Sequence, residues 1–217
     1  MMKALHFLRP PLLALTLAAL AAPLAAETFR EGVDYELVEP AQNTETGERI
    51  EVREIFWYGC PHCFDFEPFV ERWLEDRPEN VEFVRMPAVF RQTWAIHARA
   101  FYAARALGKL EAMHGPLFRA IHVERRKLFD RESIAAFAAG QGIDREAFDQ
   151  AYDSFSVEGK ARKAAQLSRS YGITGVPAVI VNGRYRTSGR MAGSYDRLLK
   201  IIDFLVAKER EGQTTGS

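Results

Sequence analysis

The segment 50–58 carries a run of β-branched and aromatic residues, with the adjacent charges Arg53 and Glu54 in its middle. A run that is apolar on both faces is typical of a central strand covered on both sides. Gly59 ends the run. Pro61 follows at a position where the first residue of a helix tolerates proline, because no N–H is needed there. The pattern therefore predicts a strand that leads directly into a helix.

The middle of the chain has a helical spacing of its apolar residues. The helix that begins at Pro61 is expected to end at Arg77-Pro78, because the residue before a proline avoids the helical conformation. Residues 81–86 form a second short strand. From about residue 93 the spacing predicts helices near residues 93–107, 113–123, 131–139, 144–152 and 157–171, with Gly108, Gly140 and Gly172 as left-handed residues directly after three of them.

Toward the C-terminus the pattern returns to strands. Residues 178–181 are rich in β-branched side chains, and Asn182-Gly183 is a strong signal for a type I′ hairpin turn. Residues 184–187 then form the returning strand. Ser194 is placed to cap a final helix.

The order of these elements defines the fold class. A strand, a helix and a strand come first, then a block of helices, then a strand, a hairpin, a strand and a last helix. We therefore expect an α/β domain with an all-helical domain inserted in its middle. The expected limits are residues 27–88 and 165–211 for the discontinuous sheet domain, 89–164 for the helical insertion and 212–217 for a flexible tail.

The first 26 residues differ in character from the rest. A positive segment with Lys3 and Arg9 precedes an apolar run of about 12 residues, which is well short of the roughly 20 needed to span a bilayer. The small residues Ala25-Ala26 then offer a cleavage site. We interpret residues 1–26 as a signal peptide cleaved near Ala26 rather than as a membrane anchor.

Composition and charge narrow the function classes. The chain of 217 residues is 47% hydrophobic and 27% charged, which argues against a disordered protein and against a multi-span membrane protein. Twenty-nine basic and 29 acidic residues give a formal net charge of zero. We expect no nucleic-acid partner, because nucleic-acid binders normally carry a basic excess.

The candidate chemistry lies in the two cysteines of the chain, Cys60 and Cys63. They would close a very short loop, and the stabilisation from a cross-link grows with loop length. A zinc site is disfavoured, because there is no second pair of cysteines and the five histidines are scattered. We therefore favour a reactive dithiol over an inert buried pair.

Cys60 falls at the cap position of the helix that begins at Pro61. The unpaired N–H groups and the positive end of the helix dipole favour a thiolate there, so we expect a lowered pKa. A helix end supplies up to about 2 kcal/mol, or roughly one and a half pKa units. His62 is a candidate to add a hydrogen bond or a charge. Cys63, one turn into the helix, is expected to be less exposed and to act as the resolving thiol.

Residues 54–63 (EIFWYGCPHC) and the distant Gly175-Val176-Pro177 resemble the DsbA family of periplasmic disulfide oxidases in the thioredoxin superfamily. The similarity extends over nearly the whole chain after residue 26. It implies a thioredoxin-like fold with a helical insertion and a cis Val176–Pro177 bond facing the dithiol, where base rates alone favour a trans bond. The backbone of Val176 would then pair with an extended substrate segment.

The resemblance also implies an activity. The chain would be an enzyme, a thiol:disulfide oxidoreductase that donates its Cys60–Cys63 disulfide, with Pro61 and His62 in the catalytic motif, to newly exported proteins that have free cysteines. A substrate thiolate would attack Cys60, and Cys60 would later leave as a stable thiolate. No metal and no cofactor besides the disulfide is implied. A membrane quinone reductase of the DsbB type would reoxidise the protein, which we expect to be a periplasmic monomer.

Glu54 has two interpretations. It is a solvent-facing residue at a strand edge, or a buried carboxyl beneath Cys63 whose raised pKa suits proton exchange with the resolving thiol. The resemblance places a second acid at Glu67 and a basic residue at Arg85, which would offset the cost of burying Glu54.

Other functions stay open on the sequence alone. A periplasmic reductase or isomerase is the runner-up, although Pro-His between the cysteines does not favour it. A copper carrier that uses the dithiol and a chaperone with a vestigial dithiol follow. Tyr58-Gly59 departs from the aromatic pair of some family members, which leaves the family's hydrophobic groove in doubt. His97 and His122 are expected to be packed or surface residues rather than ligands.

Overall fold

The structure, a computed structural model, describes residues 28–215, so the predicted signal peptide lies outside the described residues. The strands are β1 (Glu36–Leu37), β2 (Ile50–Phe56), β3 (Val81–Pro87), β4 (Ala178–Val181) and β5 (Tyr185–Ser188). The helices are α1 (Pro61–Asp76), α2 (Gln92–Ala106), α3 (Leu110–His122), α4 (Arg131–Gly140), α5 (Arg145–Tyr152), α6 (Phe155–Ser170), α7 (Gly189–Ala192) and α8 (Tyr195–Thr215).

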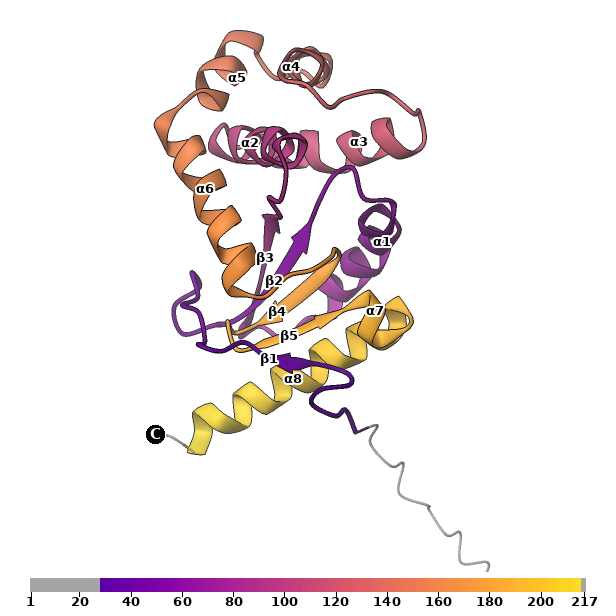
Figure 1. The fold of residues 1–217 in the computed structure, drawn as a ribbon, viewed down its shortest axis with the longest axis vertical. Helices are drawn as coiled ribbons and strands as arrows, with labels where there is room; N and C mark the ends of the chain where they lie inside the picture. Colours follow the sequence, from indigo (N-terminus) through magenta and orange to yellow (C-terminus); the bar gives the residue numbers. More distant parts are fainter. Residues whose placement is uncertain (1–27, 216–217) are drawn as a thin grey trace, which may run out of the picture.

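The strands form one mixed sheet in the order β1-β5-β4-β2-β3. β2 runs parallel to β3 and antiparallel to β4, and all seven of its residues are buried. This confirms the prediction of an interior strand covered on both faces. Figure 1 shows β2 and β3 pointing toward α2 and α3, at the end of the sheet that carries the helical insertion.

Two apolar cores fix β2 in place. One lies between the sheet and the helices α1 and α8, and includes Val52 and Ile202. The other joins the end of the sheet to the inserted helices through Phe56, Phe101 and Phe118. Because β2 contributes side chains to both cores, the turn that follows it is anchored from both sides.

The architecture is the α/β fold with a helical insertion that the sequence predicts, since α2 to α6 lie between β3 and β4 in the chain. The domain boundary that we expect after residue 88 falls between β3 and α2. The limit expected after residue 164 falls inside α6, so one continuous helix leads from the insertion back to the sheet.

The ends of two elements differ from the prediction. β2 stops at Phe56, before the expected end at residue 58, because the chain turns: the Cys60 N–H donates to the Trp57 carbonyl oxygen at 2.9 Å. α3 begins at Leu110 rather than near residue 113. The turn before Cys60 is what separates the strand from the helix.

The glycines predicted at helix ends are confirmed at two of three positions. Gly108 and Gly172 have positive φ angles of 66° and 63°. Gly140 instead is the last residue of α4, and the left-handed position is Gly142 with φ 77°. The helix end closes there because the Ile143 N–H donates to the carbonyl oxygen of residue 138 at 3.1 Å.

The C-terminal part follows the prediction up to its last turn. Asn182 and Gly183 both have positive φ angles, 50° and 67°, as a type I′ turn requires. Ser194 Oγ accepts from the Arg197 N–H at 3.2 Å at the start of α8. α8 then continues to Thr215, beyond the point at residue 212 where the sequence predicts a tail. A lone glycine costs about 1 kcal/mol in a helix but keeps its N–H, so it need not end one.

Two short elements, β1 and α7, escape the sequence pattern because two and four residues are too few to show a period. Within residues 28–215, none of the helices combines the length and the apolar character needed to cross a membrane.

Candidate active site

The turn after β2 and the first turn of α1 position both cysteines. Cys60 immediately precedes α1 with an extended backbone (φ −94°, ψ 116°), and Pro61 is the first helical residue. Since Pro61 has no N–H, the first backbone N–H groups of the helix belong to His62 and Cys63. Both N–H groups act on the Cys60 sulfur.

The two thiols differ in exposure. Cys60 is 9% exposed and Cys63 is fully buried, and neither is in a disulfide in this structure. The order of exposure is the predicted one, although Cys60 is more covered than a freely accessible nucleophile. A thiol from another molecule therefore meets Cys60 first.

The surroundings also separate the pKa values of the two thiols. The pKa of Cys60 falls from 9.0 to about 6, chiefly through a hydrogen bond from the Cys63 thiol; burial opposes this, and the N–H groups of Cys63 and His62 and the charge of His62 add to it. Burial raises the pKa of Cys63 well above its ordinary value, and the interaction with Cys60 raises it further. At neutral pH the pair holds a thiolate on Cys60 and a proton on Cys63. The sequence did not point to the Cys63 thiol as the main donor.

The loop before β4 brings Val176 to the dithiol. Ala178 lies opposite Ile55 in the antiparallel register of β4 and β2, so the residues just before β4 lie beside the turn that leads to Cys60. Cys60 Sγ lies 3.4 Å from the Val176 carbonyl oxygen, to which the thiol donates when it is protonated. The Val176–Pro177 bond is cis, as the family resemblance implied.

Two cavities adjoin this loop. The larger, of about 700 Å³, has a mixed wall that includes His62, Ile173, Val176, Pro177, Arg186, Arg190, Met191 and Tyr195. The smaller, of about 440 Å³, is lined by aromatic side chains, among them Trp57, Phe90 and Trp94. A cavity is therefore present beside His62 and the Val176–Pro177 loop, and its wall is partly charged.

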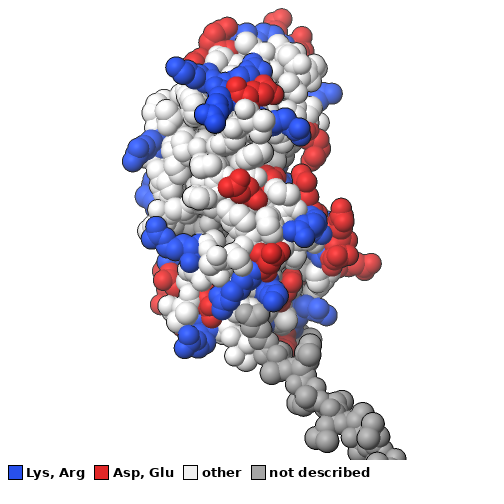
Figure 2. Space-filling model, turned by 90° about the vertical axis from the view of Figure 1, so that its right-hand side faces the viewer, with Lys and Arg blue, Asp and Glu red and all other residues white. Residues whose placement is uncertain are grey.

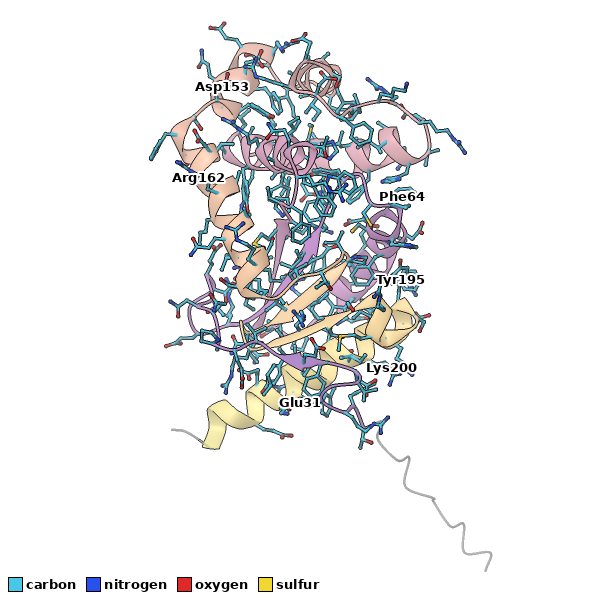
Figure 3. The ribbon with its side chains drawn as sticks, viewed as in Figure 1. Glu31, Phe64, Asp153, Arg162, Tyr195 and Lys200 are labelled. Carbon is cyan, nitrogen blue, oxygen red and sulfur yellow. The ribbon has the colours of Figure 1, made fainter. Side chains whose placement is uncertain are left out.

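Aromatic side chains hold the first turn of α1 from two directions. The Tyr195 hydroxyl donates to the His62 carbonyl oxygen at 2.9 Å. The Phe64 ring stacks on His122, with centroids 5.3 Å apart. Figure 3 shows Phe64 toward α3 and Tyr195 beside α7, with α1 between them. His122 Nε2 also donates to the Tyr58 carbonyl oxygen at 2.7 Å, so it packs as expected.

A buried charged cluster lies next to Cys63. Glu54 is fully buried, which confirms its interpretation as a buried carboxyl and excludes the solvent-facing one. Arg85 Nε lies 3.3 Å from Glu54 Oε2, and Arg85 Nη2 donates to Glu67 Oε2 at 2.9 Å. Burial, and then the charge of Glu67, raise the pKa of Glu54 to about 8, and Arg85 opposes this. The three residues that the resemblance singled out are thus in contact.

Two further residues of this cluster, Tyr58 and His114, were not identified as site residues from the sequence. His114 Nδ1 lies 2.9 Å from the Tyr58 hydroxyl, and its Nε2 lies 3.3 Å from Glu67 Oε1. The spacing of α3 marks position 114 as buried, but a lone buried histidine gives no further signal. His97 behaves as expected, because its Nε2 donates to the Leu128 carbonyl oxygen at 2.7 Å in the core.

Known proteins resemble this chain in sequence and in fold. Residues 51–202 match the model of a DSBA-like thioredoxin domain. The thiol:disulfide interchange protein DsbA of Pseudomonas aeruginosa is 42% identical over 186 residues, which cover 85% of this chain and 88% of that protein. The DsbA of Burkholderia cepacia is 38% identical over 201 residues, which cover 92% and 95%.

Solved structures agree with the sequence comparisons. The crystal structure of Pseudomonas aeruginosa DsbA superposes with a TM-score of 0.82 at 40% identity and covers 86% of this chain and 97% of that one. DsbA from Xylella fastidiosa superposes with a TM-score of 0.76 at 32% identity, covering 82% and 96%.

In the reduced protein, the ultraviolet absorbance of a thiolate should titrate near pH 6, the pKa of Cys60. Cys63→Ala removes the main donor to that thiolate and should raise its pKa by about one unit or more. Cys63→Ser keeps a hydroxyl donor and should raise it less. A Cys63→Ala protein that titrates like the unaltered protein would show that the Cys63 thiol does not stabilise Cys60.

Proposed function

Because the chain belongs to the DSBA-like thioredoxin family and is a protein thiol:disulfide oxidoreductase, we propose that it oxidises the thiols of other proteins with a disulfide between Cys60 and Cys63. The observation that carries the proposal is the separation of the two thiol pKa values, about 6 at Cys60 and far higher at Cys63. A sulfur that is stable as a thiolate leaves readily from a mixed disulfide. Release of an oxidised substrate is therefore favoured over reduction of a disulfide.

The transfer moves two electrons from substrate to enzyme. A first substrate thiolate attacks the Cys60 sulfur, the Cys60–Cys63 bond breaks, and the Cys63 sulfur takes up a proton because of its raised pKa. A second substrate thiolate then attacks the substrate sulfur of the mixed disulfide, and Cys60 leaves as a thiolate. Of the two protons that the substrate thiols give up, one offsets the proton now on Cys63 and the other goes to solvent.

Three residues near the two cysteines each support the transfer in this proposal. Glu54 donates the proton to Cys63, since a buried carboxyl with a pKa of about 8 is protonated at neutral pH. His62 contributes its N–H and its charge to the Cys60 thiolate. Pro61 starts the helix at the residue after Cys60. Together these residues hold the dithiol in one reactive arrangement.

Val176 and Pro177 bind the substrate backbone in this proposal. A polypeptide attached to Cys60 must lie along their loop, because the Val176 carbonyl oxygen is 3.4 Å from the Cys60 sulfur. In Figure 2, the side of the molecule that carries α1 and α3 shows few charged side chains over its middle. Such a surface suits unfolded chains with exposed apolar residues.

The cellular setting follows from the family. We expect the protein in the periplasm after cleavage of its signal peptide near Ala26, with newly exported proteins as its substrates. A membrane quinone reductase of the DsbB type would restore the disulfide, and the dithiol would need no metal or other cofactor. The protein would work as a monomer, with residues 89–164 as a helical domain inserted between residues 27–88 and 165–211.

Exchange of single cysteines tests the assigned roles. Cys60→Ser should abolish oxidation of a dithiol peptide. Cys63→Ser should accumulate mixed disulfides through Cys60, because the resolving thiol is missing and the complex persists. Non-reducing electrophoresis with mass spectrometry identifies the linked cysteine. Complexes that form through Cys63 in the Cys60→Ser protein would reverse the assignment.

The reduced protein should be more stable than the oxidised one at neutral pH. The closed loop is short, so the cross-link itself stabilises little, whereas the reduced protein gains a stabilised thiolate. The folded pKa of Cys60, about 6, is depressed below the unfolded value near 9.0, so this contribution is complete above about pH 9, amounts to about 1.4 kcal/mol at pH 7, and disappears as the pH falls through 6.

Paired urea denaturation of the oxidised and reduced proteins between about pH 5 and pH 8 measures this difference. The gap should narrow in acid. An oxidised form that is the more stable one at pH 7 would favour a reductase over an oxidase.

A further inference from the structure

His114 connects the helical insertion to the charged cluster beside the dithiol. It lies on α3, is 7% exposed, and stands between the fully buried Tyr58 and Glu67, which is 8% exposed. Its Nδ1 is 2.9 Å from the Tyr58 hydroxyl and its Nε2 is 3.3 Å from Glu67 Oε1. Both ring nitrogens therefore have a polar partner among largely buried side chains.

The partners of His114 determine where its proton lies. An ionised carboxylate only accepts hydrogen bonds, so Nε2 must carry the hydrogen that points at Glu67. Burial lowers the pKa of His114, which leaves the ring neutral at pH 7 with Nδ1 as an acceptor. The Tyr58 hydroxyl must then donate to Nδ1. Tyr58 thus holds His114 in the tautomer that donates to Glu67.

This hydrogen bond makes the two carboxyl groups around Arg85 unequal. Glu67 accepts one directed hydrogen bond from Arg85 and a second from His114. Among the described residues, neither oxygen of Glu54 accepts any, and the Arg85 Nε facing Glu54 is likewise without a hydrogen-bond partner. Two close carboxyl groups do not both ionise readily, and the better hydrogen-bonded one keeps the negative charge.

We propose that His114 is a positioning residue, which fixes the negative charge on Glu67 and thereby leaves Glu54 as the carboxyl that carries the proton for Cys63. The inference rests on the proposed role of Glu54 as proton donor. It places one determinant of the dithiol chemistry in the helical insertion, on α3.

The groups that face Glu54 are few. Arg85 approaches from β3, and Glu67 and Cys63 approach from α1. Tyr58 lies in the turn after β2. From β4 the residue opposite is Val179, which does not titrate. On α3 itself, Glu111 acts on His114 only at a distance and raises its pKa. Loss of the His114 N–H leaves Glu67 with the side-chain hydrogen bond from Arg85.

Removal of the His114 N–H should therefore let Glu54 lose its proton at a lower pH. In His114→Leu, Glu67 loses one of its two hydrogen-bond donors, so its pKa rises. The positive charge of Arg85 then stabilises Glu54 and Glu67 more equally, and the pKa of Glu54 falls by about one to three units. His114→Gln keeps an N–H donor of similar reach and should shift Glu54 much less. A purely structural role for His114 would affect stability in both variants without this difference.

The test is the rate of a single disulfide transfer from each oxidised protein to a dithiol peptide, measured between about pH 6 and pH 8. The ratio of the His114→Leu rate to the unaltered rate cancels the ionisation of the peptide. It should fall at least about fivefold over this interval, because Glu54 loses its proton at a lower pH in the variant than in the unaltered protein. The corresponding ratio for His114→Gln should stay nearly flat.

If the His114→Leu protein folds poorly, a direct measurement of the Glu54 protonation state still tests the proposal. The carboxyl stretch in infrared difference spectra reports the protonation of Glu54, and Glu54→Gln assigns the band. Tyr58→Phe should lower the titration midpoint of Glu54, because the tautomer of His114 is then no longer fixed. A flat His114→Leu ratio, or an unmoved Glu54 midpoint in the variants, overturns the proposal. Mixed disulfides trapped by Cys63→Ser would still form in that case, so the failure would not be that of the oxidase function.

Discussion

The interaction between the Cys60 sulfur and the first turn of α1 is the one on which the rest of the site depends. That turn offers the sulfur the Cys63 thiol and the N–H groups of His62 and Cys63. These donors stabilise a negative charge and have little to give a neutral disulfide sulfur. The energy difference between the two redox forms is thus set by a few hydrogen bonds within one helical turn.

The fold keeps these donors aimed at the sulfur. β2 is anchored in both cores, so the turn from Trp57 to Cys60 starts from a rigid strand. The Tyr195 hydroxyl holds the His62 carbonyl oxygen from the side of α8. Val176 reaches the sulfur because the register of β4 against β2 is fixed. A donor set that is already oriented costs no reorganisation when the thiolate forms.

The strand that supports the site also carries buried charges of two kinds. Arg53 donates to Glu51 Oε1 at 2.7 Å, and the Glu45 N–H donates to Glu51 Oε2 at the same distance. Glu54, three positions on, has Arg85 near it but accepts no hydrogen bond among the described residues. Burying an ion costs several kcal/mol unless its partners are well placed. Both oxygens of Glu51 are thus hydrogen-bonded, whereas Glu54 lacks such bonds in the described part of the chain, which supports the proton exchange that we propose for it.

What the sequence could predict was local in the chain. The strand, the helix that starts at Pro61, the Asn182-Gly183 turn and the exposure order of the cysteines all follow from neighbouring residues. Glu67 and Arg85 came from the resemblance rather than from any pattern. His114 could not be found, because its partners Tyr58 and Glu67 lie 56 and 47 residues away. Such contacts depend on how the insertion packs, which periodicity does not encode.

The most direct test of this account is the redox equilibrium of the protein with glutathione, compared with that of an unstructured peptide carrying the same Cys-Pro-His-Cys motif. If the folded site stabilises the Cys60 thiolate, the protein should be reduced at glutathione ratios that leave the peptide oxidised. The difference should shrink as the pH falls toward the Cys60 pKa of about 6. A protein no more oxidising than the peptide at pH 7 would contradict the account.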